Sequence, residues 1–383
     1  MKAWVRITLG VSISAWAALS GAQSVRQLQL GTAVARAAEP LSLVTTVREL
    51  KNGRLMVADP IERKLLVFDA TLRSPRQLGR EGSGPGEYRQ PDGVWAFRGD
   101  STLVLDLGNA RLSVVSLDGT YGRSLPLSSG GPGAPPTAMF PGGTDALGGI
   151  YFAPRGMGPA DSTNLMRADA MGANAKPVAR LKAPEVDRQE SGGADSRQVR
   201  VVPIPLSASD GWAVSPEGEV VVARAGNYHV EWLSAGATRR GAPVSVPRAR
   251  IGDAEKKEWV NQQMLSGGIS MQVQEENGER SVSFGRNRPQ QEPNTAGYKW
   301  PAAKPPFDAS TLRVDATGRL WVRRLRPAGE PVTYDVFGQD GGHQAVVTFP
   351  AGRTLLGFGA TALYAADVDK DGQYTIERYA IPQ

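Results

Sequence analysis

Three aspartates near the C-terminus stand at the spacing of a calcium-binding loop. Asp367, Asp369 and Asp371 alternate with other residues and precede Gly372, which reproduces the first half of the pattern D-x-D-x-D-G. Oxygen ligands at alternate positions around a glycine turn suit a hard cation. The second half of the segment does not match the calcium-binding pattern, because Arg378 stands at the twelfth position, where such loops carry glutamate. The segment indicates either a calcium site at these three aspartates or a charged β-hairpin turn.

Two arginines stand at equivalent positions of a repeated phrase. Arg224 and Arg324 each end a short apolar run that follows a turn glycine, and Arg155 lies just after the corresponding run of another copy. A guanidinium group is a rigid fork of donors that matches a carboxylate or sulfate. Trp259 and Trp300 belong to the segment that joins the copies ending in the first two arginines. These five residues are the predicted ligand-binding site. The alternative is that the arginines bond to their own loops and the tryptophans pack on the rim of the fold.

The matching position is acidic in three other copies, which end in Asp59, Asp106 and Asp367. If the copies form a closed ring, these acids occupy one half of its mouth and the arginines occupy the other. Such a mouth would attract an anionic group to its basic half. The alternative is that Asp59 and Asp106 pair with Arg63 and Arg111 and hold their own loops in place.

Cysteine is absent and histidine is scarce. Disulfides, thiolate metal sites and a cysteine nucleophile are therefore excluded. The two histidines, His229 and His343, are expected at opposite faces of the fold. This separation disfavours a histidine zinc site and a Ser-His-Asp triad. A metal-assisted hydrolase or lyase that uses carboxylates alone remains an alternative.

The repeated phrase determines the predicted architecture. It occurs six times and ends at positions 59, 106, 154, 224, 324 and 367. A four-stranded propeller blade needs about 40–50 residues, which matches the spacing except where extra residues precede positions 224 and 324. We therefore predict an all-β, six-bladed β-propeller. Its blades form one domain, because each blade exposes apolar faces that only its neighbours can cover.

Two further segments complete this architecture. Residues 248–306 form an insertion between blades four and five that is partly helical, with a helix expected over 253–265. The last blade supplies only three strands before the chain ends. An open edge would leave backbone groups unpaired. We predict that Val25–Leu30, which alternates apolar and polar residues, provides the fourth strand of that blade.

The N-terminus is typical of a secretory signal. Lys2 and Arg6 precede a short apolar stretch over 7–19 and small residues at 20–22. We expect a signal peptide over 1–22, a mature domain over 23–383 and no membrane span after cleavage; a second possible cleavage lies at 35–38. The net charge of +6 is not gathered into runs of Lys or Arg, so no nucleic-acid partner is expected. The predicted location is the periplasm or the cell exterior.

Residues 79–119 resemble an NHL repeat. A glycine-rich loop with Pro85, Gly86 and Tyr88 leads to a strand that ends in Asp106, and Asn109 and Arg111 follow. The whole chain is similar to bacterial secreted six-bladed propellers of that superfamily. The resemblance implies a binding platform, although some relatives are enzymes, such as peptidyl-amidating lyases and gluconolactonase-like hydrolases, which need metal ligands.

The expected function is therefore that of a secreted or periplasmic binding module, monomeric, which takes a peptide, glycan or protein partner on its loop-rich face. No cofactor is expected, apart from the calcium ion that Asp367, Asp369 and Asp371 could hold.

Overall fold

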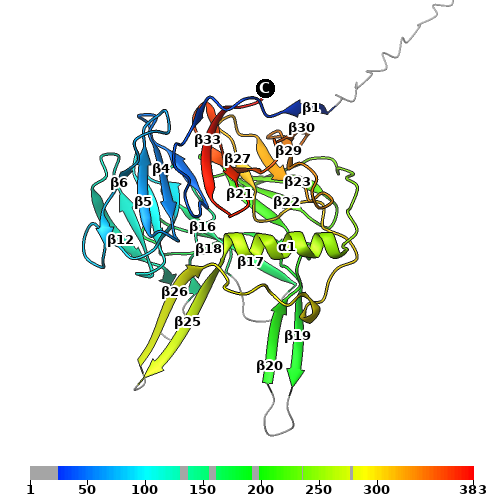
Figure 1. Ribbon diagram of the computed structural model, residues 1–383, viewed down its shortest axis with the longest axis horizontal. Helices are drawn as coiled ribbons and strands as arrows, with labels where there is room; N and C mark the ends of the chain where they lie inside the picture. Colours follow the sequence, from blue (N-terminus) through cyan, green and yellow to red (C-terminus); the bar gives the residue numbers. More distant parts are fainter. Residues whose placement is uncertain (1–24, 130–136, 155–160, 192–197, 235, 277–278) are drawn as a thin grey trace, which may run out of the picture.

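The computed structural model describes residues 25–129, 137–154, 161–191, 198–234, 236–276 and 279–383. Predicted signal residues 1–22 lie outside these ranges. Six blades, each a sheet whose strands follow one another from the centre of the ring outward, form a six-bladed β-propeller (Figure 1). The predicted fold class is therefore confirmed. Among the described residues, no helix is long and apolar enough to cross a membrane.

The first three blades follow the predicted order along the chain. Blade one contains β3 (Val47–Glu49), β4 (Leu55–Asp59), β5 (Lys64–Phe68) and β6 (Arg76–Gln77). Blade two contains β9 (Pro91–Ala96), β10 (Thr102–Asp106), β11 (Arg111–Val115) and β12 (Tyr121–Pro126). Blade three contains β15 (Gly143–Thr144), β16 (Ile150–Phe152), β17 (Ser162–Ala168) and β18 (Lys176–Lys182). Short pairs connect them: β7 (Arg80–Glu81) with β8 (Glu87–Tyr88), and β13 (Ser128–Ser129) with β14 (Thr137–Ala138).

The last three blades complete the ring. Blade four contains β21 (Gly211–Val214), β22 (Val220–Arg224), β23 (His229–Ser234) and β24 (Ala237–Arg240). Blade five contains β27 (Arg313–Val314), β28 (Leu320–Arg323), β29 (Thr333–Phe337) and β30 (His343–Thr348). Blade six contains β31 (Arg353–Phe358), β32 (Ala362–Val368) and β33 (Tyr374–Ala380). The innermost strand of each blade contacts those of its two neighbours, and β31 returns to contact β3.

The N-terminal segment closes the ring in a different way from the one predicted. The strand β1 (Arg26–Gln29) pairs in parallel with β30, so it extends blade five instead of completing blade six. The fourth strand of blade six is β2 (Ala35–Arg36), which is antiparallel to β33. The prediction for Val25–Leu30 was wrong because the backbone of this segment bonds to β30, ending with Leu30 N–H to the Thr348 carbonyl at 2.9 Å, while the Leu30 side chain packs between blades five and six. The chain therefore crosses from one blade to the next at this residue.

The apolar core is divided among the interfaces between blades. Each of the six interfaces has its own cluster of buried side chains. Between blades two and three, for example, Leu103 and Leu105 pack with Ile150 and Phe152. Because every blade buries apolar area against two neighbours, the strands of the ring stabilise one another around the whole circle.

Two insertions stand on one face of the ring. The loops that enter each blade and those that join its second and third strands share this side, which we call the loop-rich face. The hairpin β19 (Val186–Ser191) and β20 (Gln198–Pro203) lies between blades three and four. The segment between blades four and five contains α1 (Asp253–Ser266), β25 (Gly268–Glu276), β26 (Glu279–Asn287) and η1 (Thr295–Gly297). Figure 1 shows both hairpins projecting to the same side, with α1 between them and the blades.

The predicted helix is confirmed, with its start at Asp253. Its N-cap is Gly252, whose backbone N–H donates to the Glu255 carboxylate at 3.0 Å. The helix ends at Gly267, which has a positive φ of 60° that suits glycine.

Candidate functional site

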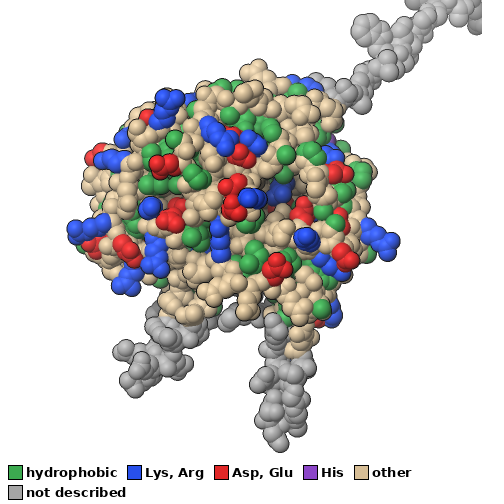
Figure 2. All heavy atoms as spheres, in the orientation of Figure 1, with side chains coloured by type: hydrophobic (Ala, Val, Ile, Leu, Met, Phe, Trp, Pro, Cys, Tyr) green, Lys and Arg blue, Asp and Glu red, His purple; other side chains and the backbone are tan. Residues whose placement is uncertain are grey.

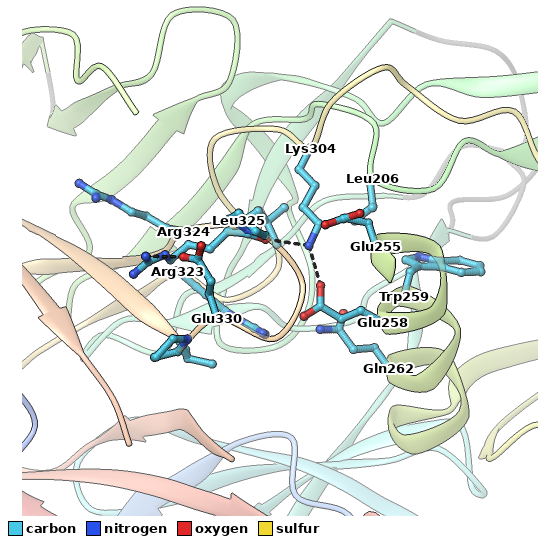
Figure 3. A pocket seen from close by; sticks show the side chains of 14 residues that line it. Leu206, Glu255, Glu258, Trp259, Gln262, Lys304, Arg323, Arg324, Leu325 and Glu330 are labelled. Carbon is cyan, nitrogen blue, oxygen red and sulfur yellow. Dashed lines mark hydrogen bonds and ion pairs between the residues drawn. The ribbon is translucent and has the colours of Figure 1, made fainter. Parts of the chain in front are cut away.

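A buried lysine fixes one end of the insertion to blade five. Lys304 is only 1% exposed, and its Nζ donates to Glu258 Oε2 on α1 at 2.6 Å and to the Arg326 carbonyl at 2.8 Å (Figure 3). An ammonium group buried in this way is stable only when partners replace its water. Lys304 therefore ties α1 to the loop that follows the second strand of blade five.

Two arginines fix the other end of the insertion on the far side of the ring. Arg286 forms an ion pair with the buried Asp92 of blade two, and its backbone exchanges hydrogen bonds with the Gln90 amide at 2.7 and 2.9 Å. Arg288 donates to the carbonyls of Ser42 and Gly372, next to blades one and six. The insertion thus reaches across the mouth of the propeller from blade five to blades six, one and two.

Arg286→Ala is expected to lower the free energy of unfolding by about 3 kcal/mol, because it leaves the buried Asp92 carboxylate without its cation. Urea denaturation measures this change, and hydrogen exchange at the base of β26 should speed up. The matched control is Arg248→Ala, since Arg248 also belongs to the insertion but is exposed and donates only to carbonyls. Equal losses in the two variants would contradict the anchoring role of Arg286.

Three aromatic side chains gather where α1 meets the end of the insertion. Trp259 packs edge to face against Trp300 at 5.5 Å and against Tyr298 at 5.3 Å between ring centroids. Lys256 Nζ lies 5.9 Å from the centroid of the Trp300 ring. All three rings are half-buried, so each presents part of its surface to solvent. Half-exposed, mutually braced rings are good contact surfaces for peptides and sugars, since little side-chain entropy remains to be lost.

A small polar cavity of about 50 Å³ lies beside Trp259. Figure 3 shows its walls, which come from α1 and from the loop after β28. Its charged side chains are Glu255, Glu258, Lys304, Arg323, Arg324, Arg326 and Glu330. Hydrogen bonds from the backbone N–H groups of Ala328 and Gly252 lower the pKa of Glu255, so this carboxylate is held in its charged form. The cavity is thus lined by both signs of charge.

The structure separates the two arginines of the predicted site. Arg324 lines the cavity beside Trp259, whereas Arg224 does not. Arg224 is 25% exposed and forms ion pairs with Asp210 at 2.9 Å and Glu231 at 2.8 Å. Trp300 does not line the cavity; it packs against Trp259, which does. Arg155 lies outside the described residues.

A buried carboxylate that the sequence analysis did not single out organises Arg324. Asp335 is fully buried. Its carboxylate accepts a hydrogen bond from Arg324 Nε at 2.8 Å and forms an ion pair with Arg324 Nη2 at 2.6 Å. The Tyr228 hydroxyl donates to it at 2.8 Å, and His343 Nε2 lies 2.8 Å from its Oδ1. Burial alone would raise the pKa of Asp335, but His343 and Arg324 outweigh it and hold this pKa below its usual value. In the sequence, the one feature that could have indicated this buried carboxylate is an aspartate within the mostly apolar strand β29.

The aspartates that end β4 and β10 bond to their own loops, as the alternative interpretation predicted. Asp106 accepts hydrogen bonds from the backbone of Gln90 at 3.0 Å and from the Asn109 amide at 2.7 Å, with Arg111 Nε at 3.5 Å. Asp59 accepts from the backbone N–H of Ser42 at 2.7 Å and also from those of two residues that follow it. Arg63, however, pairs with Glu81 instead of Asp59.

The aspartate-rich segment forms the turn between β32 and β33. Asp369 accepts from the backbone N–H groups of Asp371 and Gln373, both at 2.9 Å. Asp367 pairs with Arg36 at 2.9 Å and Arg353 at 3.2 Å. Within the described part of the chain, no three His, Asp or Glu side chains are grouped so that they could hold a metal ion. The carboxylates predicted to bind calcium are therefore not gathered around one point.

Comparisons with known proteins agree on the architecture. Residues 28–128 match a family described as a 6-bladed beta-propeller. No curated protein sequence matches the chain. A solved member of the DUF4221 family from Bacteroides vulgatus is 11% identical, with a TM-score of 0.50, and the alignment covers 94% of this chain and 100% of that one.

Two other solved structures are more distant. A gluconolactonase from Xanthomonas campestris is 12% identical with a TM-score of 0.42, over 93% of this chain and 96% of that one. The calcium-binding protein regucalcin from Agrobacterium tumefaciens is 12% identical with a TM-score of 0.40, over 93% and 97% of the two chains. The family match and the DUF4221 structure bear on the fold alone: the chain is similar to that structure along nearly its whole length, and its residues 28–128 match a 6-bladed beta-propeller family.

Proposed function

We propose that this protein is a secreted or periplasmic binding propeller that takes a peptide, glycan or protein partner on its loop-rich face. The observation that carries the proposal is the insertion pinned across this face, at one end by the buried Lys304 and at the other by Arg286. A surface that is already ordered loses little entropy when a partner binds. The insertion is thus suited to recognition.

The contact surface of the proposed site is the aromatic cluster of Trp259, Tyr298 and Trp300. Aromatic side chains near charged groups are typical of binding hot spots. Arg324 and the mixed charges of the adjacent cavity would supply polar contacts at its edge. The hairpins β19/β20 and β25/β26 project on the same side, so they could extend the contact with a macromolecule (Figure 1).

Export is part of the proposal. It is supported by the basic residues, apolar stretch and small residues at the N-terminus of the sequence. The described fold begins at Val25, three positions after the end of the predicted signal peptide, so cleavage near residue 22 would leave β1 intact.

The test screens the purified chain against a peptide array and a glycan array. We expect binding to one class of probe and a tenfold or greater loss of affinity for Trp300→Ala, because a half-buried aromatic contact is removed. The control is Leu147→Ala, which removes an exposed side chain from the loop between the first and second strands of blade three, on the opposite face. Probes that lose affinity equally for both variants would show that the loop-rich face is not the binding surface.

The alternative from sequence, a metal-assisted hydrolase or lyase, makes a different prediction. It requires tight calcium binding, for which a calorimetric titration of chelator-treated protein is the direct measurement. Micromolar binding that is abolished in Asp369→Ala but retained in Asp340→Ala would favour this alternative. Asp340 is a matched control, since it also accepts a backbone hydrogen bond within a turn between strands.

A further inference from the structure

A second cleft lies away from the loop-rich insertion, between the outer parts of blades four and five. Its volume is about 500 Å³. One wall is the N-terminal strand, with Val25 and Gln27, and the other is the segment over 242–245 that follows β24. Clefts of this size accommodate small organic ligands.

An arginine and a histidine belong to the lining of this cleft. Arg324 and His343 both line it, and both also contact the buried carboxylate of Asp335. A guanidinium group has five N–H donors; Arg324 Nε donates to Asp335 Oδ2 at 2.8 Å, and Nη2 lies 2.6 Å from Asp335 Oδ1 as an ion pair. Among the described residues, no group accepts a hydrogen bond from Arg324 Nη1. The Arg324 side chain is 22% exposed, so part of it remains in contact with solvent while it is paired with Asp335.

The remaining walls are mostly apolar. Val25, Pro243, Val244 and Val346 belong to the lining of the cleft. Val346 is buried and lies beside Gln27, its register partner in the pairing of β30 with β1. A ligand that fills this space would therefore place an apolar part against the valines and an acceptor group next to the guanidinium.

We propose that this cleft binds a small amphipathic carboxylate, with its carboxylate on Arg324 Nη1 and its hydrocarbon part between β1 and the 242–245 segment. Asp335 neutralises much of the charge of Arg324, so the apolar walls must contribute a large share of the affinity. The cleft shares Arg324 with the cavity beside Trp259, whereas its other walls come from the N-terminal segment, β30 with the turn before it, and the segment after β24, so variants in β1 test it separately from a partner on the loop-rich face.

Straight-chain carboxylates from butanoate to octanoate are the probes, titrated into the full chain by calorimetry. Affinity should rise about threefold to fourfold with each added methylene group, as expected for hydrocarbon moving from water into an apolar site. Hexylamine and hexanamide are the charge controls and should bind at least tenfold more weakly than hexanoate. Equal affinity for hexanoate and hexylamine, or no binding of octanoate, would overturn the proposal.

Paired variants locate the site. Gln27→Trp places a large ring in the cleft and should reduce octanoate affinity at least tenfold, whereas Gln29→Trp should not. The two glutamines are matched, since both are exposed on β1 and only Gln27 lines the cleft. Arg324→Lys keeps the charge but loses the fork of donors, and should also weaken binding about tenfold. If Gln29→Trp weakens binding as much as Gln27→Trp, the probe binds elsewhere.

Discussion

Deleting residues 23–38 is expected to lower the free energy of unfolding by on the order of 5 kcal/mol, a large fraction of the stability of a typical domain. The deletion removes β1, β2 and two buried side chains, Leu30 and Ala37. Burial of a leucine contributes about 1.5–3 kcal/mol and each backbone hydrogen bond about 1 kcal/mol. The segment makes such bonds from Leu30 to Thr348, and from Ala37 to Ile376.

A shorter deletion separates the contribution of β1 to stability from that of β2. Removing only residues 23–32 takes away β1 and Leu30 but keeps β2 on blade six, so about half of the loss is expected. Chemical denaturation of the three proteins gives the comparison. Equal stability of the full-length and 23–38-deleted proteins would show that the N-terminal segment does not close the ring. For the same reason, if the chain is exported as proposed, its mature N-terminus should precede Val25, which N-terminal sequencing can check.

Asp335→Asn is expected to cost about 3 kcal/mol, because it leaves the guanidinium of Arg324 in a mostly buried position without its carboxylate. The same change weakens the contact of His343 with this position. Urea denaturation at neutral pH measures the loss. Asp340→Asn is the control, since Asp340 lies in the next turn and bonds only to a backbone N–H, and its cost should stay below about 1 kcal/mol. Similar losses in both variants would contradict a special role for Asp335.

The pH dependence of stability provides a second measurement of Asp335. Its pKa is lower in the folded protein than in the unfolded chain, so its charged form stabilises the fold above the unfolded carboxyl pKa of about 4. This contribution is lost as the pH falls through the folded pKa, when the carboxylate takes up a proton. Unfolding experiments between pH 7 and pH 2 should therefore show a smaller loss of stability for Asp335→Asn than for the unsubstituted protein.

The repeated phrase alone predicted the number of blades, their order and the position of the helical insertion. This was possible because a propeller blade is a local unit: its strands are adjacent in sequence, and alternating apolar residues between turn glycines are enough to mark them. The loop-holding role of Asp106 was also accessible, since Asn109 and Arg111 stand within five residues of it.

Contacts between distant segments were decided only by the tertiary structure. The sequence of Val25–Leu30 is compatible with an edge strand on either blade five or blade six. Leu30 packs against both blades, and the parallel pairing of β1 with β30 places the segment on blade five. Arg224 and Arg324 hold equivalent positions in their repeats, and each pairs with a carboxylate at the same register position of the following strand, Glu231 and Asp335. The second partner of Arg224, Asp210, precedes the first strand of its blade and was not marked by the repeat. The hydrogen bond from Tyr228 of blade four to Asp335 of blade five depends on a distance across the blade interface, and a repeat pattern carries no information about such distances.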